Sequence, residues 1–218
     1  TETLAYAMAD SPMGPFTFTG IIMDESPSGC WTNHHSITEY NGQWYLFYHH
    51  NDYSPNFDKN RSARIDSLFF NTDGTIKKVK PTLRGVGITD ARSKIQIDRY
   101  STISPYGVTI DYLEPSNTFE GWQTLFNRAG TWVTYNKVDF GTTPVKRLKA
   151  RVRSEKGGAI TLRTPGEKGM TIAELPIKPT GKWTEISTNV SNAPTSMQDL
   201  IITQTGENPV AVDWISFE

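Results

Sequence analysis

The sequence predicts an all-β protein in which a partial β-propeller is followed by a β-sandwich jelly roll. Two strand-like runs, at residues 35–40 and 43–48, flank Asn41-Gly42, and this combination is the strongest short-range signal for a β-hairpin. From residue 94 onward, short strand-like runs recur between turns rich in Gly, Pro, Ser and Asn, as they do in sandwiches. No stretch has the apolar period of an amphipathic helix.

Composition places the chain among globular proteins and removes several classes of partner. The 218 residues are 36% hydrophobic and 21% charged, and the formal net charge is -1. This composition supports a packed core, whereas the near-neutral charge gives no field to attract nucleic acid or an anionic membrane. No apolar run approaches the roughly 20 residues that span a bilayer. We therefore expect neither a nucleic-acid partner nor a membrane span.

The single cysteine, Cys30, excludes a disulfide within the chain. Two interpretations of it are open: a small buried side chain, which we favour, or a nucleophilic thiol near His34 and His35 in the sequence. Residue 1 is Thr, and no apolar leader follows it. We expect that a leader has been removed or that the sequence lies inside a longer protein.

Residues 1–85 contain strand-like runs for about one and a half propeller blades. Two runs form the last part of one blade, at residues 4–8 and 16–23. Further runs supply one full blade, at residues 35–40, 43–48, 61–70 and 75–79. A closed propeller needs at least about four blades, and an open one leaves bare strand edges. We therefore expect N-terminal blades outside this sequence.

The pattern changes after residues 86–93, a connection containing Gly and Asp that we expect to be a linker. Short runs then recur over residues 94–218, at 95–100, 132–138, 147–153, 159–163, 171–174, 184–189, 199–203 and 210–217. About eight strands in about 125 residues suit a jelly-roll sandwich. The run at 147–153 alternates apolar and charged residues, as a strand with one solvated face should.

Segments of the first part, in order along the chain, resemble glycoside hydrolase family 43. They are YAMADSPMGPF at residues 6–16, NHHSI at 33–37, GQWYLFYH at 42–49 and NTDGTI at 71–76. The resemblance implies a five-bladed propeller and an inverting glycosidase of the arabinofuranosidase or xylosidase type, acting on xylan- or arabinan-type plant polymers. Members of the family use an Asp base, a second Asp and a Glu acid, all upstream of the segment that matches residue 1.

The carboxylates of the first part match none of these catalytic positions. They are Asp10, Asp24, Glu25, Asp52, Asp58, Asp66 and Asp73. Asp73 precedes Gly74 and is interpreted as a turn residue. Asp66 lies in a strand, and Asp52 and Asp58 lie in a polar loop at residues 51–60. We therefore expect no catalysis by this chain alone.

The same resemblance places His34, Arg61 and Trp31 at the floor of the active site. His34 matches a position that helps to hold a metal ion, usually calcium, or an ordered water network on the propeller axis; a buried structural histidine is the alternative. Arg61 matches an arginine that reaches the sugar or its carboxylates, and a surface arginine is the alternative. Trp31 lines the cleft or simply packs. His49 and His50 face either the cleft or a solvated loop.

The second part resembles a family 6 carbohydrate-binding module. The matching segments are QID at residues 96–98, AGTWVTY at 129–135, VDFG at 138–141, GKW at 181–183 and VDWISF at 212–217. The resemblance implies a sugar-binding site in which aromatic rings stack on a pyranose and polar groups bind its hydroxyls.

By this match, Phe126 and Trp183 are opposing aromatic platforms, and Asp111 is a carboxylate that binds a sugar hydroxyl. The family's Asn before the final Asp-Trp pair is replaced here by Ala211, and Asn208 is nearby but out of register. Sugar binding and a purely structural role therefore both stay open. Two further residues are rivals for the aromatic platforms: Trp122 and Trp132.

Calcium is the cofactor that the resemblance implies. Gln96, Asp98 and Asp213 match a structural calcium site near the first and last strands, where oxygen ligands would hold the sandwich shut. The alternative is a pair of Asp side chains satisfied by backbone amides. His34 is the candidate for a second ion, on the propeller axis.

The leading hypothesis is the C-terminal portion of a plant-polysaccharide glycosidase with an appended carbohydrate-binding module. Its expected partners are a xylan- or arabinan-type polysaccharide and the missing N-terminal blades. Its expected location is secreted, periplasmic or on the cell surface. Two alternatives are a non-catalytic carbohydrate-binding module and a structural unit that stiffens the propeller.

Overall fold

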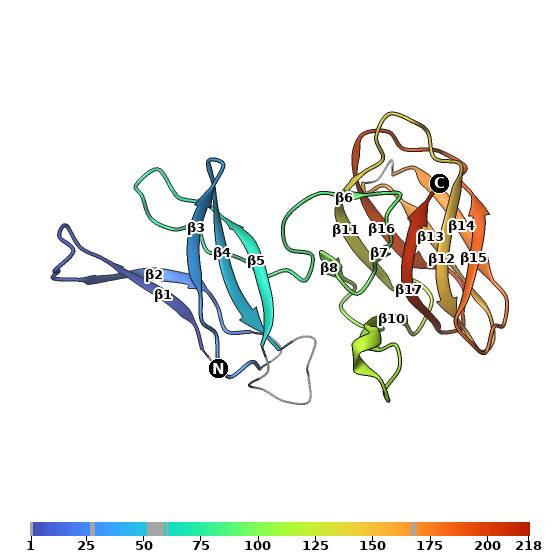
Figure 1. The fold of residues 1–218 in the computed structure, drawn as a ribbon, viewed down its shortest axis with the longest axis horizontal. Helices are drawn as coiled ribbons and strands as arrows, with labels where there is room; N and C mark the ends of the chain where they lie inside the picture. The colour runs from blue at the N-terminus through green and yellow to red at the C-terminus, as the bar shows by residue number, and fades with distance from the viewer. Residues whose placement is uncertain (1, 27–28, 52–58, 60, 167–168) are drawn as a thin grey trace. The chain divides into compact units, whose positions relative to one another are not determined.

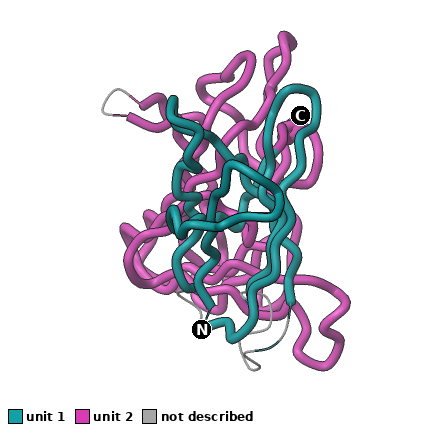
Figure 2. The backbone as a smooth tube through the Cα atoms, turned by 90° about the vertical axis from the view of Figure 1, so that its left-hand side faces the viewer, with its two compact units in different colours: residues 1–86 teal, residues 87–218 magenta. Residues whose placement is uncertain are grey.

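The computed structural model describes residues 2–26, 29–51, 59, 61–166 and 169–218. The chain divides into two compact units, Thr1–Val86 and Gly87–Glu218 (Figure 2). Both consist of strands, and the described part contains one short helical segment, the 3-10 turn η1 (Thr118–Glu120) (Figure 1). The predicted all-β class is therefore confirmed. Nowhere in the described ranges is there a helix long and apolar enough to cross a membrane.

The first unit contains two antiparallel sheets. One pairs β1 (Leu4–Met8) with β2 (Thr17–Met23), and the other has the order β3 (Ser36–Tyr40), β4 (Gln43–His50) and β5 (Ser62–Leu68). Asn41 and Gly42 join β3 to β4 with φ angles of 51° and 75°. Positive φ at both residues is the conformation of a type I′ hairpin turn, so the hairpin predicted at Asn-Gly is confirmed.

A small apolar core lies between these two sheets. It consists of Leu4, Ile22, Met23, Leu46, Tyr48, Leu68 and Val79. The strand predicted at residues 75–79 is not formed, and among the described residues this run makes one isolated bridge, between Phe70 and Ile76. The Val79 amide instead donates to the Ile22 carbonyl on β2, at 2.7 Å. This run therefore links the two sheets and does not complete a four-stranded blade.

The second unit is a jelly-roll sandwich of two sheets. The first sheet has the order β15-β12-β17-β10-β9, with β7 also paired to β17, and the second has the order β14-β13-β16-β11-β6, with β8 paired to β11. The first sheet comprises β7 (Ile95–Gln96), β9 (Val108–Tyr112), β10 (Trp122–Phe126), β12 (Arg147–Arg153), β15 (Thr184–Asn189) and β17 (Val210–Phe217). The second comprises β6 (Thr89–Asp90), β8 (Thr102–Ile103), β11 (Trp132–Asp139), β13 (Gly158–Arg163), β14 (Thr171–Ile177) and β16 (Met197–Gln204).

Some strands of the sandwich were predicted with their observed bounds, and others were shortened or missed. β12, β15 and β17 have the predicted bounds. The run predicted at 95–100 shortens to β7, because the Arg99 amide turns back to the Gln96 carbonyl at 3.2 Å. β9 and β10 were not predicted.

The loop expected at 51–60, with Asp52 and Asp58, lies almost entirely outside the described residues.

Residues 87–93, expected to belong to a linker, are part of the second unit. β6 pairs in parallel with β11, and Ala91 is fully buried in the core of the sandwich. The Arg92 guanidinium donates to the carbonyls of Phe140 and Thr143, at 2.9 and 2.7 Å. These bonds fix the connection to the sandwich, so it does not act as a free linker.

Candidate functional site

The outward face of the first sheet presents a row of side chains from neighbouring strands. In β12, Leu148, Ala150 and Val152 point into the core, so the alternating Arg151 and Arg153 point outward. The strand register aligns a first row of Arg153, Ala211, Leu125 and Thr109. Beside it, Arg151 is paired with Glu185 and with Trp214, and Gln123 is paired with Asp111.

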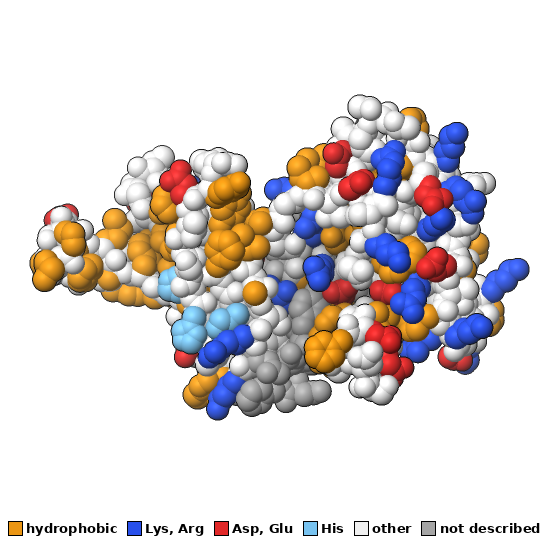
Figure 3. Space-filling model, in the orientation of Figure 1, with side chains coloured by type: hydrophobic (Ala, Val, Ile, Leu, Met, Phe, Trp, Pro, Cys, Tyr) orange, Lys and Arg blue, Asp and Glu red, His pale blue; other side chains and the backbone are white. Residues whose placement is uncertain are grey.

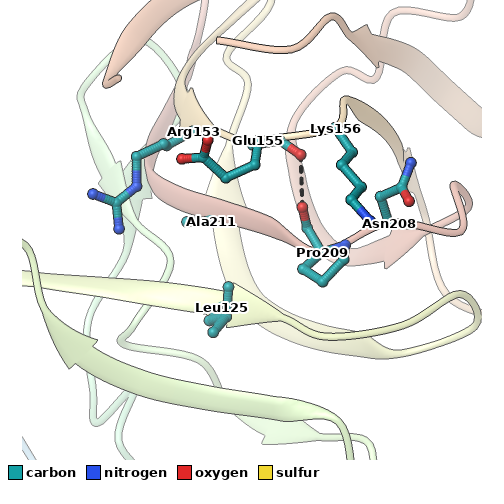
Figure 4. Close-up of a pocket in the computed structure, with 8 residues that line it drawn as sticks. Leu125, Arg153, Glu155, Lys156, Asn208, Pro209 and Ala211 are labelled. Atoms are coloured by element: carbon teal, nitrogen blue, oxygen red, sulfur yellow. Dashed lines mark hydrogen bonds between the residues drawn. The ribbon is translucent and has the colours of Figure 1, made fainter. Parts of the chain in front are cut away.

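A pocket of about 530 Å³ lies at the first row (Figure 4). Its described lining is Leu125, Arg153, Ser154, Glu155, Lys156, Asn208, Pro209 and Ala211. The Ser154 hydroxyl donates to the Pro209 carbonyl at 2.7 Å and so ties the end of β12 to the start of β17. Figure 4 shows Lys156 extending alongside Asn208 and Glu155 directed to the side where Arg153 lies. Apolar side chains and a polar rim can thus cover a ring face and bind hydroxyl groups.

Trp183 lies just before β15 and is half-buried. The guanidinium carbons of Arg151 and Arg153 lie 5.3 and 5.2 Å from its ring centroid, within the range of cation–π contacts. Because Arg153 also lines the pocket, it joins the Trp183 ring to the pocket. The indole Nε1 is buried and has no hydrogen-bond partner among the described groups.

Phe126 does not face this site, which corrects the prediction that it is a stacking platform. Its side chain is fully buried in the core of the sandwich. Successive side chains of a strand point to opposite faces, so it is the preceding residue, Leu125, that lines the pocket. The prediction was therefore one residue out of register, and the position facing the pocket is aliphatic.

Asp111 lies on β9, the edge strand of this sheet, and its side chain is exposed. Its Oδ1 accepts a hydrogen bond from the Tyr112 amide at 2.8 Å. It shares the outward face with Trp183 but does not line the pocket. The structure thus places both predicted residues on one face of the sheet.

The predicted calcium ligands lie where β7 meets β17, the last strand of the sandwich. Gln96 on β7 is paired with Trp214 on β17, and Asp98 and Asp213 are each only 3% exposed. Asp213 Oδ2 accepts a hydrogen bond from Arg151 Nη1 at 2.6 Å. Burial raises the pKa of Asp213, and the Arg151 guanidinium opposes this rise.

These residues give a partial fit to a calcium ion. Buried carboxylate oxygens suit a hard cation, but Arg151 already neutralises one oxygen of Asp213. No group of three or more His, Cys, Asp and Glu side chains converges within the described ranges. Gln96 and backbone carbonyls would have to complete the coordination shell.

The first unit has its own pocket, of about 370 Å³, where two predicted residues meet. His34 and Arg61 both line it, together with His35, Ser36, Phe47, Tyr48, His49 and Ala63. The His34 amide donates to His49 Nε2 at 3.0 Å. Burial lowers the pKa of His49, and the Arg61 guanidinium lowers it further. Figure 3 shows the histidines grouped on one face of this unit, beside basic side chains.

The described lining of this histidine pocket contains no carboxylate. Asp66 accepts hydrogen bonds from the Tyr48 hydroxyl and from Thr82, and Asp73 accepts one from the Thr75 amide at 3.0 Å, so both have structural partners. Trp31 is 55% exposed and is not among the described residues that line the pocket. Cys30 is buried, and its thiol donates to the Thr32 carbonyl, as expected of a structural side chain.

Comparison with known families decides the identity of the second unit. Residues 104–218 match the family described as carbohydrate binding module (family 6). The chain belongs to this family. A crystal structure of a family 6 carbohydrate-binding module from Clostridium cellulolyticum in complex with xylose matches with a TM-score of 0.52 and 28% identity, over 60% of this chain and 99% of that one.

Similarity to larger proteins extends beyond the carbohydrate-binding module. The chain is 28% identical over 219 residues to an arabinoxylan arabinofuranohydrolase of Paenibacillus polymyxa, a match that covers 93% of this chain and 34% of that protein. A glycoside hydrolase family 43 arabinoxylan arabinofuranohydrolase from Bacillus subtilis, solved with cellotetraose, matches with a TM-score of 0.61 and 25% identity, over 98% of this chain and 47% of that one. The chain thus spans about a third of the length of the curated relative.

The structure adds residues to the candidate site of the module that the sequence did not single out. Arg151 and Arg153 both lie near the Trp183 ring, Arg153 also lines the pocket, and Leu125 takes the place expected for Phe126. The alternation of residues 147–153 already indicated a solvated arginine face. The contacts of that face with Trp183 depend on pairing between strands far apart in the sequence, which no local pattern specifies.

Proposed function

We propose that the module binds an arabinose- or xylose-containing plant polysaccharide on the outward face of its first sheet. We further propose that the first unit forms part of the floor of a glycosidase active site whose catalytic carboxylates lie outside this chain. The match to an arabinoxylan arabinofuranohydrolase over 93% of the chain carries this proposal, because it extends over both units. The family of the second unit supports the sugar-binding part.

The chemistry of the pocket suits a neutral sugar. A pyranose ring has an apolar face that stacks on an aromatic or aliphatic surface, and here Trp183 and Leu125 provide such surfaces. Its hydroxyls need donors and acceptors, which Asn208, Glu155 and Lys156 provide at the rim. Ala211 leaves room where a larger side chain would fill the pocket.

The histidine pocket of the first unit suits a role in holding substrate. Arg61 offers several donors in a planar fork to sugar hydroxyls or to a carboxylate. His49 Nε2 accepts a hydrogen bond from the His34 amide, and this bond holds the ring in one orientation. The lowered pKa of His49 favours the neutral form. A metal ion or ordered water at His34, and a cleft contact by Trp31, belong to this proposal.

Calcium belongs to the proposal as a structural ion. Gln96, Asp98 and Asp213 would hold it, and it would neutralise buried negative charge where β7 meets β17. Its role would be to hold these strands together. We also propose that the protein works outside the cytoplasm, where polymeric plant substrates are found.

Binding to soluble arabinoxylan, measured by affinity electrophoresis and calorimetry on the whole chain, tests the proposal. We expect the wild type to bind and Trp183→Ala to lose at least about fivefold in affinity, since an aromatic stacking contact contributes about 1 kcal/mol or more. The matched control is Trp132→Ala, which removes a half-buried tryptophan from the other sheet. We expect its affinity to stay within about twofold.

Other outcomes separate the alternatives. Loss of binding in Trp132→Ala but not in Trp183→Ala would move the site to the second sheet. Absence of binding by a folded wild type would leave the structural role. For the enzymatic part, we expect the isolated chain to leave aryl arabinofuranosides and xylosides intact, and turnover of either by this chain would overturn the assignment of the carboxylates.

A further inference from the structure

The loop at residues 113–121 joins β9 to β10 and carries Phe119 in the turn η1. The Phe119 side chain is 98% exposed. The loop is nevertheless closed by backbone hydrogen bonds from Leu113 to Gly121 at 3.0 Å and from Asn117 to Glu114 at 2.9 Å. An ordered loop therefore holds the Phe119 ring in solvent.

Ring packing and side-chain hydrogen bonds also order the base of this loop. The rings of Tyr112 and Trp122 lie 4.2 Å apart at an interplanar angle of 30°, and Leu113 beside them is buried. The Glu114 carboxylate accepts hydrogen bonds from the Ser116 amide and hydroxyl, at 3.0 and 2.7 Å. An aromatic side chain on a pre-organised loop loses little conformational entropy when it binds a ligand.

The loop lies on the free edge of the sheet that carries the pocket. β9 is the last strand in the order β15-β12-β17-β10-β9, and Trp183 precedes the first. Hydrogen bonds from Ser116 lower the pKa of Glu114, and the Arg153 guanidinium, which lines the pocket, contributes to the same shift. The charge of a residue that lines the pocket therefore acts on Glu114 in the loop. Five strands span about 19 Å, much more than one sugar ring.

We propose that Phe119 is a second aromatic platform, which stacks on a sugar ring at the far end of a polysaccharide bound across the strands from Trp183. This inference rests on the proposed sugar-binding function and adds an extended site to it. It follows from the loop's place at the edge of the sheet that carries the pocket, from the hydrogen bonds that order the loop, and from the exposed ring that the loop presents. It also explains how this chain supplies two aromatic surfaces although Leu125 occupies the position facing the pocket.

Calorimetry with xylo-oligosaccharides of increasing length tests the inference on the whole chain. We expect Phe119→Ala to bind a disaccharide like the wild type and to lose roughly five- to tenfold in affinity for hexamers and polymer. Phe119→Tyr should restore the polymer affinity. The substitution to Ala should fold normally, because the ring is almost entirely exposed. Phe69→Ala, which removes an exposed phenylalanine from the first unit, is the matched control and should change neither affinity.

A fluorescent variant provides a second readout. In Phe119→Trp, we expect the added indole emission to shift on binding a hexamer and to stay unchanged with a disaccharide. If Trp183→Ala abolishes binding while Phe119→Ala binds every length like the wild type, the second platform is refuted and the sugar-binding function stands. If the folded wild type binds no oligosaccharide or polymer, the sugar-binding function itself is refuted.

Discussion

The two units differ in how completely they bury their large apolar side chains. In the sandwich, two sheets cover each other, and large side chains such as Phe140, Phe217 and Ile160 are completely buried. The first unit has a much smaller core and leaves large apolar side chains exposed, including Met13, Phe16, Phe18 and Tyr40. The first unit thus covers less of its apolar surface, and exposed apolar side chains of this kind suit the packing of further blades that we propose.

The largest expected effect comes from the core of the sandwich. Phe217 is fully buried, and its ring meets that of Phe140 at 5.0 Å and 67°. Phe217→Ala should lower the free energy of unfolding of this unit by about 3–5 kcal/mol, because it removes apolar contacts and leaves a cavity. Hydrogen exchange should show the loss of protection only in the second unit, and an equal loss in both units would contradict their independence.

The second largest effect is expected from calcium, which should stabilise one unit and not the other. Saturating calcium, at about one hundred times its Kd, should stabilise the sandwich by about 2.7 kcal/mol over the chelated protein and leave the first unit unchanged. Scanning calorimetry with calcium and with EDTA measures this difference. Asp98→Asn should abolish the shift, while Asp24→Asn, at an exposed site in the first unit, should keep it. Identical scans with and without EDTA would remove calcium from the proposal.

Alkaline pH should destabilise the first unit through Tyr48. Burial raises the pKa of the Tyr48 phenol, and the Asp66 carboxylate that accepts its hydrogen bond raises it further. Tyrosine in the unfolded chain ionises near pH 10, so the stability from this group is complete below about pH 10 and falls as the pH rises above it.

Unfolding in urea at pH 7 and pH 11 tests this dependence. Tyr48→Phe should cost about 1–2 kcal/mol at pH 7, because buried Asp66 loses a donor, and should reduce the alkaline decline. Tyr40→Phe, at an exposed tyrosine, is the control and should keep the wild-type decline. A decline of the same size in Tyr48→Phe would assign the alkaline sensitivity to another group.

The smallest effect is expected at an exposed ion pair of the first unit. Lys78 Nζ lies 2.8 Å from Asp24 Oδ1, but both side chains are more than half exposed. Lys78→Ala should change the free energy of unfolding by less than about 0.5 kcal/mol, because solvent and salt screen the pair. A chemical-denaturation curve at low and high salt checks this, and a cost above about 1 kcal/mol would show that the pair is effectively buried.

The sequence specified the strands whose side chains alternate between core and solvent. β12 has the predicted bounds because its inward residues, Leu148, Ala150 and Val152, lie in the core at every second position. β17 has the predicted bounds although nearly all of its residues are buried. β9 and β10 escaped prediction because their alternation is short and β10 buries neighbours on both faces, as Gln123 and Thr124 show. The run at 75–79 has strand-like residues, but its Val79 amide donates a hydrogen bond to Ile22 on β2.

The candidate site was only partly predictable for a related reason. Trp183, just before β15, and Asp111 on β9 come together only through the order of the strands in this sheet, and the sequence alone does not give that order. The choice between Phe126 and Leu125 depended on a register of one residue, which the burial of Phe126 settles. The resemblance placed His34, Arg61 and Trp31 at the floor of an active site; in the structure His34 and Arg61 line one pocket, and Trp31 is not among its described lining residues.

The central place of β17 has a consequence for the biosynthesis of the sandwich. β17 pairs with β12, β10 and β7, all of which precede it in the chain (Figure 1). Until Val210–Phe217 have left the ribosome, the first sheet lacks its middle strand, and the apolar faces of its neighbours have nothing to close against. The sandwich therefore folds only after β17 has been synthesised. Nascent chains arrested before residue 210 should be sensitive to protease.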